Sequence, residues 1–368
     1  MSKPRRRALR GERRPAIIYC EGNFGSLDGK TANGLVRYSE VYEILAVIDS
    51  ERSGRDSGEL LDGKRNGIPI CRDLAEAKEK AGSEPSHFIF GMAPATGVLT
   101  IDQRRLLLEA INMRLNIVNG LHEFLNDDQE FLEASKAMNV ALIDVRRPPP
   151  KKLMRLFSGR ISAVACPRIA ILGTDCAIGK RTTATILTNA LHQYGLKAVM
   201  VSTGQTGLIQ GNCYGVALDA VPSQFCAGEL EGEIIEAYES ENPDVIIIEG
   251  QGALSHPAFS TSSFILRGSC PDGVILQHAP GRKNRCDFPS MPMPLPSKEI
   301  NLIQTFAETK VIGLTINHEN MTETEVKKAI KKYESELDLP VMDALTAPPD
   351  LLVKMVSIAF PEISGKIK

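Results

Sequence analysis

A glycine-rich segment from Gly173 to Thr183, with the sequence GTDCAIGKRTT, has the residue types of a phosphate-binding loop. It follows the apolar run 168–172 and opens a helical pattern. In that context glycines let the backbone wrap around phosphate oxygens, and the helix start offers unpaired N–H groups. A glycine-rich turn without a ligand is the structural alternative. We expect the following residues to bind the phosphates of a ligand: Gly173, Thr174, Asp175, Gly179, Lys180, Arg181, Thr182 and Thr183.

The residue after the lysine of this loop departs from the usual magnesium-binding pattern. In most such loops it is a serine or threonine whose hydroxyl ligates Mg²⁺, whereas here it is Arg181. A guanidinium repels a cation and binds phosphate oxygens directly. We therefore expect protein cations to hold the phosphates, with no metal required. A pyrophosphate that is bound and not cleaved, such as that of coenzyme A, fits this loop better than ATP.

Polar side chains follow the third and fourth apolar runs of the C-terminal half. Glu249 and His256 come after run 245–248, and His278 comes after run 273–276. The carboxyl ends of parallel strands share one edge of a sheet, so these candidates for proton transfer are expected near the loop. Each has a structural alternative: a magnesium-water or loop-capping role for Glu249, a surface turn for His256, and a hydrogen-bonded shell position for His278.

A positively charged loop follows His278. Arg282, Lys283 and Arg285 could bind the carboxylates of an acidic amino acid, or they could form a solvated loop. Cys176 lies inside the phosphate loop, where a small apolar filler is favoured over a covalent acyl carrier.

Alternating β-branched runs and helical patterns predict two parallel α/β sheets covered by helices. The expected strands of the first half are 16–20, 44–48, 87–90, 115–118 and 139–144, and those of the second half are 168–172, 197–201, 245–248, 273–276 and 311–316. We predict a disordered basic tail at 1–14, a Rossmann-like domain at 15–147, a proline-rich linker or crossover at 148–165, and a three-layer α/β/α P-loop domain at 166–368. Asp49, at the end of the second run, would suit a ribose, but the nearby glycines lack Gly-x-Gly-x-x-Gly spacing, so NAD binding is not favoured and a structural or substrate-covering role is expected for the first domain.

Composition gives no support for several classes of protein. The net charge of −2 gives no support for nucleic-acid binding, and no apolar run is long enough to span a membrane. The eight cysteines show no Cys-x-x-Cys spacing, so neither a zinc site nor a disulfide framework is indicated. We expect a cytoplasmic homo-oligomer with reduced thiols and a small-molecule substrate.

The loop that begins Gly-Thr-Asp, with five residues between Gly173 and Gly179, resembles that of dethiobiotin synthetase. The whole chain resembles a two-domain bacterial and archaeal family whose characterised member is a D-glutamate N-acetyltransferase. The resemblance implies a Rossmann-like first domain and a P-loop second domain. It also implies acetyl transfer from acetyl-CoA to the amino group of a D-amino acid, with D-glutamate as the expected acceptor. The matching segments are 22–25 with 28–32, 173–183, 204–207 and 249–257.

Two other functions stay open at this point. One is an ATP- and magnesium-dependent kinase or ligase acting on a small carboxylate, which Arg181 disfavours. The other is a non-catalytic nucleotide-binding regulator, which the polar residues after the third and fourth runs disfavour.

Overall fold

The computed structural model describes residues 12–94 and 97–366 of the 368-residue chain. It divides into two units, the first made of residues 1–148 and 205–213 and the second of residues 149–204 and 214–368. Most of the expected basic tail, residues 1–11, lies outside the described residues. Arg14, placed in that tail by the sequence, instead begins the first strand.

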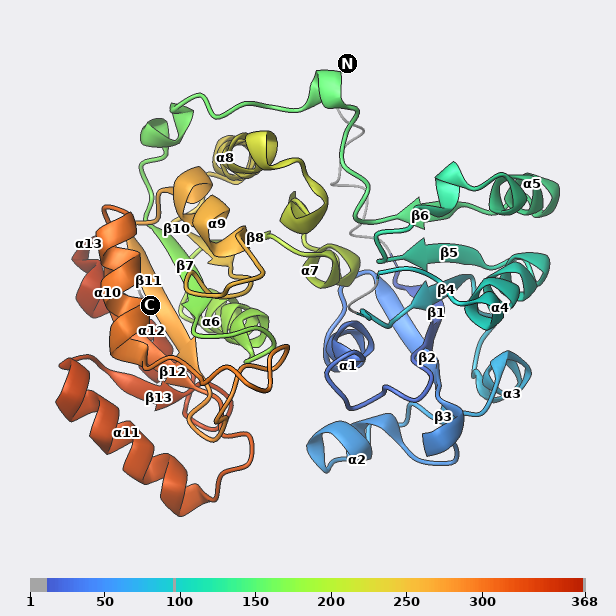
Figure 1. Ribbon diagram of the computed structural model, residues 1–368, viewed down its shortest axis with the longest axis horizontal. Helices are drawn as coiled ribbons and strands as arrows, with labels where there is room; N and C mark the ends of the chain where they lie inside the picture. Colours follow the sequence, from blue (N-terminus) through green and yellow to red (C-terminus); the bar gives the residue numbers. More distant parts are fainter. Residues whose placement is uncertain (1–11, 95–96, 367–368) are drawn as a thin grey trace. The chain divides into compact units, whose positions relative to one another are not determined.

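The first unit is built on a six-stranded parallel sheet with the order β3-β2-β1-β4-β5-β6, the Rossmann arrangement. Its strands are β1 Arg14–Tyr19, β2 Tyr42–Ile48, β3 Ile70–Cys71, β4 His87–Phe90, β5 Asn116–Asn119 and β6 Leu142–Asp144. Its helices are α1 Lys30–Arg37, α2 Ser57–Asp62, α3 Leu74–Lys80, α4 Ile101–Asn112 and α5 Gln129–Met138, with short 3₁₀ turns η2 Ser50–Arg52 and η3 Leu125–Asp127. Helices α1 and α2 lie on one side of the sheet and α3 to α5 on the other (Figure 1).

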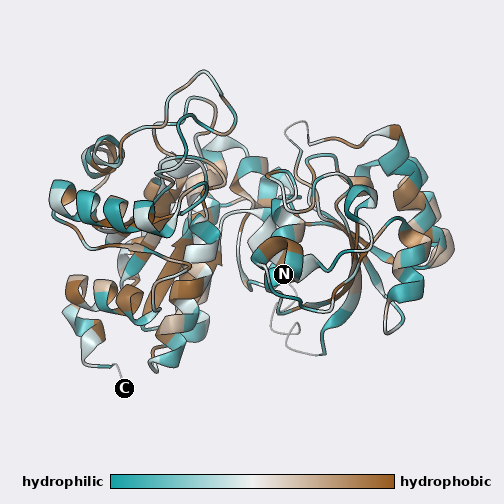
Figure 2. Cartoon of the chain, turned by 90° about the horizontal axis from the view of Figure 1, so that it is seen from below, coloured by the Kyte–Doolittle hydropathy of each residue, from teal (hydrophilic) through white to brown (hydrophobic). Residues whose placement is uncertain are grey.

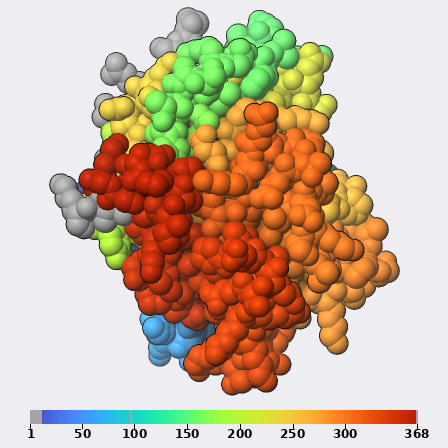
Figure 3. Space-filling model, turned by 90° about the vertical axis from the view of Figure 1, so that its left-hand side faces the viewer, coloured from blue at the N-terminus to red at the C-terminus, as the bar shows by residue number. Residues whose placement is uncertain are grey.

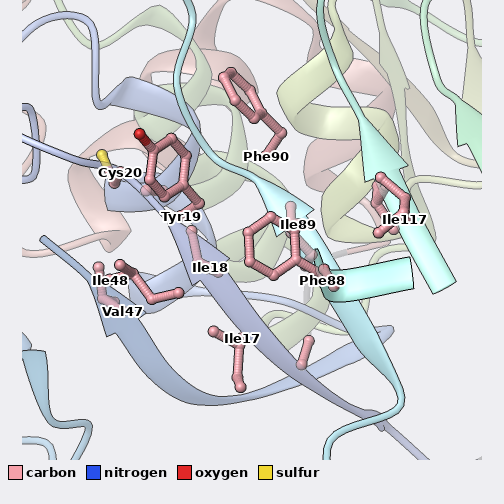
Figure 4. Packing of buried hydrophobic residues seen from close by; sticks show 14 of the residues in the cluster. Ile17, Ile18, Tyr19, Cys20, Val47, Ile48, Phe88, Ile89, Phe90 and Ile117 are labelled. Carbon is pink, nitrogen blue, oxygen red and sulfur yellow. The ribbon is translucent and has the colours of Figure 1, made fainter. Parts of the chain in front are cut away.

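The central strands of this sheet are apolar on both faces, because helices cover both. Ile17 and Ile18, which point to opposite faces, are both fully buried, as are Phe88 and Ile89 on the neighbouring strand (Figure 4). The carboxylate of Asp49 accepts hydrogen bonds from the N–H groups of Gly22 (3.2 Å) and Phe24 (3.0 Å). Asp49 therefore fixes the turn after β1.

Helix α7, Gln205–Gln210, belongs to the first unit although it lies between two strands of the second sheet in sequence. Buried hydroxyls of Thr206 and Thr31 lie 2.9 Å apart. The Gln210 side-chain amide donates to the carbonyls of Gly34 (2.8 Å) and Tyr38 (2.9 Å) at the end of α1. Residues 205–213 were expected in the P-loop domain, and no periodicity in the sequence indicates this pairing with α1.

The second unit contains a seven-stranded parallel sheet with the order β13-β12-β11-β7-β10-β8-β9. Its strands are β7 Arg168–Gly173, β8 Ala198–Ser202, β9 Tyr214–Gly215, β10 Val245–Glu249, β11 Gly273–His278, β12 Lys310–Ile316 and β13 Val341–Asp343. Its helices are α6 Lys180–Gln193, α8 Ser223–Glu241, α9 Thr261–Ser269, α10 Pro296–Phe306, α11 Glu323–Leu337, α12 Asp350–Ala359 and α13 Pro361–Ser364, with 3₁₀ turns η4 Lys151–Leu153, η5 Arg160–Ala163 and η6 Leu218–Ala220.

Helices α6, α12 and α13 share one apolar core with the sheet, and α8, α9 and α10 cover the opposite face (Figure 1). The strands are coloured as hydrophobic in the interior, and the helices turn hydrophilic faces outward (Figure 2). Residues from α10 to the C-terminus form much of one face of this unit (Figure 3). The three-layer α/β/α architecture predicted from the sequence is confirmed.

The segment 149–164, called the strap below, runs along α8 and is pinned by buried acids of that helix. Arg155 pairs with Glu229 at 2.8 Å and with Glu233 at 2.9 Å. Glu231 accepts hydrogen bonds from the backbone N–H (2.7 Å) and the hydroxyl (2.9 Å) of Ser158. Because the buried carboxylates have charged or N–H partners, their desolvation is compensated. The proline-rich crossover is thus an ordered part of the second unit.

Each expected strand is present within a few residues. In the described part of the chain, the strands that the sequence did not predict are β3, β9 and β13, which are two or three residues long and lie at sheet edges. Across the described ranges, no helix is both apolar enough and long enough to cross a membrane.

Candidate phosphate-binding site

The loop between β7 and α6 has the backbone geometry of an anion-binding turn. Helix α6 begins at Lys180, and its N-cap, Gly179, has a φ of +99° that L residues rarely adopt. No side chain caps this helix start, so its first N–H groups point into the loop. Ala177 also has a positive φ, of +48°, a conformation that costs free energy and is typical of functional loops.

Gly173 is required because the Lys180 side chain crosses directly over it. A Cβ atom at position 173 would lie 3.0 Å from Lys180 Cδ and 2.8 Å from the side chain of Ile178. The lysine is buried, and its Nζ donates to the carbonyl of Asp175 at 2.5 Å. The ammonium is therefore held inside the loop, in position to meet a phosphate.

Arg181 points to Glu249, the last residue of β10. Arg181 Nε lies 3.7 Å from Glu249 Oε1, and the other carboxylate oxygen accepts from the N–H of Thr203 at 3.3 Å. Burial raises the pKa of Glu249, and the nearby Arg181 opposes that rise. The strand carrying Glu249 approaches β7 closely: a Cβ at Gly250 would lie 1.8 Å from a β7 carbonyl, so only glycine fits there.

The threonines after Arg181 differ in their surroundings. The buried hydroxyl of Thr183 donates to Gln277 Oε1 at 2.6 Å, and the same oxygen accepts from the Thr315 hydroxyl at 2.5 Å. Thr183 is therefore committed to a buried network beneath the loop, whereas Thr182 is half-buried. A metal-ligating role for Thr183 would require this network to break.

His278 holds the loop from below, which argues against the catalytic role expected from the sequence. Its Nδ1 lies 2.8 Å from the Thr174 hydroxyl and its Nε2 lies 3.3 Å from the Tyr333 hydroxyl. Burial, followed by the charge of Lys332, lowers the pKa of His278 to about 4. With both nitrogens engaged in the interior, this histidine positions Thr174.

Arg282 joins the loop to two acids and leaves no N–H for a substrate. Its Nη1 donates to Asp175 Oδ2 (2.8 Å) and to the carbonyl of Cys176 (2.9 Å), and its Nη2 donates to the carbonyl of Ala177 (3.3 Å). Its Nε and Nη2 also donate to the Glu319 carboxylate at 2.6 and 3.0 Å. All five donors of a guanidinium are used. These contacts favour a structural role for Arg282 over the substrate contact expected from the sequence.

The other two cations of this loop lie in different environments. Arg285 is buried and donates to the carbonyl of Thr174 (3.2 Å) and to the hydroxyl of Ser255 (2.8 Å), which also favours a structural role over substrate binding. Lys283 is exposed. Of the three cations, Lys283 alone keeps the exposure that an incoming carboxylate requires.

Asp175 is the buried acid around which these groups gather. Burial would raise the pKa of its carboxyl, but the Cys286 N–H at 2.9 Å and the Arg282 guanidinium outweigh it and hold the pKa below the usual range. Its Oδ1 lies 3.8 Å from His256 Nε2, and among the described residues neither of these two buried atoms has a hydrogen-bond partner.

The ring nitrogen of His256 that faces Asp175, Nε2, carries a proton. The Nδ1 of its ring accepts from the N–H of Ala258 at 3.3 Å, so the neutral ring carries its proton on Nε2. Its ring stacks on Phe259 with centroids 4.7 Å apart, and burial, followed by Arg285, lowers its pKa. A neutral imidazole whose free nitrogen carries the proton donates hydrogen bonds and is a poor general base.

Sequence reasoning missed several residues that shape the loop. Cys286 binds Asp175 through its backbone, Gln251 donates to the carbonyl of Thr203 at 2.6 Å, and Asn317 donates to the carbonyl of Ile178 at 3.2 Å. Asn317 directly follows β12, so its position at a strand end was a usable signal. The contact of Cys286 has no such signal, because it depends on the path of the irregular segment 279–295.

The chain matches known proteins along most of its length. A family model described as the P-loop domain of a domain of unknown function, DUF1611, matches residues 155–353, and the corresponding Rossmann-like N-terminal model matches residues 50–148.

Two curated relatives carry the name D-glutamate N-acetyltransferase. One, from a Pseudoalteromonas species, is 31% identical over 300 residues, which cover 78% of this chain and 87% of the relative. The other, from Tritonibacter scottomollicae, is 29% identical over 277 residues, covering 73% and 80%.

A solved structure has the same fold over nearly the whole chain. The crystal structure of a DUF1611 family protein from Anabaena variabilis superposes with a TM-score of 0.85 at 31% sequence identity, covering 94% of this chain and 99% of that one. The matched domains, the level of identity and the shared fold together show that this chain belongs to the DUF1611 family.

Proposed function

We propose that this protein is an N-acetyltransferase that moves the acetyl group of acetyl-CoA to the amino group of a D-amino acid, with D-glutamate as the expected acceptor. Support for the reaction class and the acceptor comes from the two relatives named D-glutamate N-acetyltransferase, which this chain matches over most of its length. The handedness of the acceptor rests on those names alone.

The observation that carries the choice of acyl donor is the pairing of Arg181 with Glu249 at the head of α6. A loop built for magnesium and ATP places a hydroxyl at this position. Here a guanidinium stands in its place, and Thr183 is bound to Gln277. A loop with a buried lysine and an arginine suits a phosphate ester that is gripped and released intact, as the phosphates of coenzyme A would be.

Glu249 is the side chain we assign to proton transfer. The amine must lose a proton before it attacks the thioester carbonyl, and the raised pKa of this buried carboxyl makes it a better acceptor than an exposed acid. His278 and His256 have their basic nitrogens in use. Attack forms the C–N bond and breaks the C–S bond, and the leaving coenzyme A thiolate takes up the second proton that the nitrogen loses on becoming an amide. This assignment requires the pantetheine arm to fold back toward the loop, because phosphates and thioester lie at its opposite ends.

The test is an assay of purified protein with acetyl-CoA and a panel of D- and L-glutamate, D-aspartate and D-glutamine, with the N-acetyl product identified by mass spectrometry. We expect product with D-glutamate in the absence of added magnesium. Magnesium-dependent ATP consumption without acetylated product would replace the proposal by the kinase or ligase.

A Glu249→Gln variant separates the two duties of that residue. If Glu249 accepts the proton, wild-type activity should fall as pH drops through the raised pKa of this carboxyl, which lies above the ordinary value of 4.5. The variant should have a lower kcat and should lack this fall in activity at acid pH. A rise in the KM for acetyl-CoA with an unchanged kcat and pH profile would mean that Glu249 only holds Arg181.

A further inference from the structure

Two thiols that are far apart in sequence meet at the phosphate loop. Cys176 lies inside the loop, and Cys286 lies on the segment that crosses it. Their sulfur atoms and a carboxylate oxygen of Asp175 all lie within 4.8 Å of one another. Cys286 Sγ is also 3.7 Å from the carbonyl of Cys176. The backbone N–H of Cys286 is fixed on Asp175 at 2.9 Å, so the approach of the two thiols is built into the fold.

The surroundings divide the two thiols into a reactive and a resolving partner. A hydrogen bond from Cys286 and the charge of Lys180 lower the pKa of Cys176 against the effect of burial. Cys286 has a single S–H proton, for which Asp287 Oδ2 at 3.3 Å is an alternative acceptor, and the pKa of Cys286 is raised by its position beside Cys176. Both residues are half-buried and so open to small reagents. A low-pKa, accessible thiol beside a second thiol is the arrangement of redox-active cysteine pairs.

A bound metal fits this cluster less well, although Cys176, His256 and Asp287 also lie within 4.8 Å of one another. A metal needs a lone pair on His256 Nε2, but Nδ1 accepts from a backbone N–H, which leaves the proton on Nε2. The positive charges of Arg285 and Lys180 also act on this histidine. These cations would repel a metal ion and stabilise a thiolate.

We propose that Cys176 and Cys286 form a reversible disulfide when the protein meets a peroxide. The Cys176 thiolate attacks one peroxide oxygen, which gives a sulfenic acid and releases hydroxide. The Cys286 sulfur then displaces the hydroxyl from the sulfenic sulfur as water, forming the S–S bond. In sum, two thiols lose two hydrogens and one hydrogen peroxide becomes two waters. A dithiol reductant reverses the step by thiol–disulfide exchange.

The bond would tie the loop to the segment 279–295 next to Ala177, which already has a positive φ. A loop restrained there adjusts less freely around a phosphate. We therefore expect oxidation to lower the affinity for inorganic pyrophosphate at least tenfold, and dithiothreitol to restore it. This readout does not depend on acetyl-CoA being the substrate.

The experiment treats the full-length protein with hydrogen peroxide, blocks free thiols by alkylation and maps peptides by mass spectrometry under non-reducing conditions. Wild-type protein should lose two of its eight alkylatable thiols and yield linked peptides containing Cys176 and Cys286. Cys286→Ser should instead give a sulfenic acid at Cys176 that dimedone traps. Cys270→Ser, at an exposed thiol, is the matched control and should keep the linkage.

Two outcomes would overturn the proposed disulfide, and a third would overturn its proposed effect on phosphate binding. The first is alkylation of both thiols after peroxide treatment that oxidises Cys270. The second is protection of the pair that EDTA, and not dithiothreitol, removes, because that result indicates a bound metal. The third is a disulfide that leaves pyrophosphate affinity unchanged, which would remove its effect on the loop.

Discussion

Replacing Arg181 by threonine tests whether the loop uses a protein cation where related loops use magnesium. The substitution restores the hydroxyl that would ligate Mg²⁺ and removes the guanidinium that lies 3.7 Å from Glu249. A unit charge about 4 Å from a divalent ion contributes roughly 8 kcal/mol at an effective dielectric of 20. In the wild-type protein the opposite charges of Arg181 and Glu249 largely cancel, so their net attraction for Mg²⁺ is small. In the variant the carboxylate attracts it.

The assay is calorimetric titration of coenzyme A with and without Mg²⁺. Losing a charge-assisted contact to phosphate should weaken binding of the variant by about 1.5–3 kcal/mol, or roughly 10–150-fold. Magnesium should recover part of that loss in Arg181→Thr and should leave the wild-type affinity unchanged. Arg160→Thr removes an exposed arginine that pairs with Glu239 in the same unit and serves as the charge-matched control. A wild-type affinity that rises with magnesium, or a variant that binds normally, would refute the reasoning.

Three further changes have defined outcomes. Lys180→Ala should weaken coenzyme A binding by about 1.5–3 kcal/mol in the same titration; equal affinities would exclude the lysine from the phosphate site. Burial lowers the pKa of His278 to about 4. Between pH 6.5 and pH 4 this histidine is therefore neutral in the folded protein and protonated in the unfolded chain. Stability should therefore fall by up to about 3 kcal/mol as pH drops from 6.5 to 4, and urea unfolding of His278→Gln should show a smaller fall; an identical pH dependence would contradict this. Gly228→Ala places a Cβ 2.3–2.4 Å from backbone atoms of the strap and should cost about 1–3 kcal/mol in the same unfolding assay, whereas Gly365→Ala, in open space, should cost little; equal effects would mean that the strap moves freely.

The fold was predictable because its signals are local. The central strands carry apolar residues on both faces, and Gly173 and Gly179 punctuate the turn between strand and helix. The edge strands β3 and β13 were not predicted, because two or three residues are too few to show the alternation of a strand. The transfer of α7 to the first unit escaped for a different reason: it depends on Thr31 and Gln210 finding partners more than 170 residues away.

The candidate site was predictable in its framework and not in its contacts. Glu249 and His278 lie at the carboxyl ends of the two parallel strands that flank β7, and His256 lies 3.8 Å from Asp175 of the loop, as the strand ends predicted. Residue type alone could not distinguish a histidine with both nitrogens engaged from one with a free nitrogen. Nor could it show that all the N–H groups of the Arg282 guanidinium are hydrogen-bonded within the protein. Each distinction depends on which polar atoms are already paired, a property of the folded chain.

Asp175 explains why an anion-binding loop is surrounded by so much positive charge. A buried carboxylate in the loop would repel phosphate at close range, but Arg282 and the Cys286 N–H share one of its oxygens, and Arg285 approaches the other to 3.7 Å. Neutralised in this way, the acid orders the segment that follows His278, and its remaining charge competes less with a phosphate for the cations of the loop. The cations that looked like substrate ligands in the sequence thus serve the phosphate site indirectly, by offsetting the acid within it.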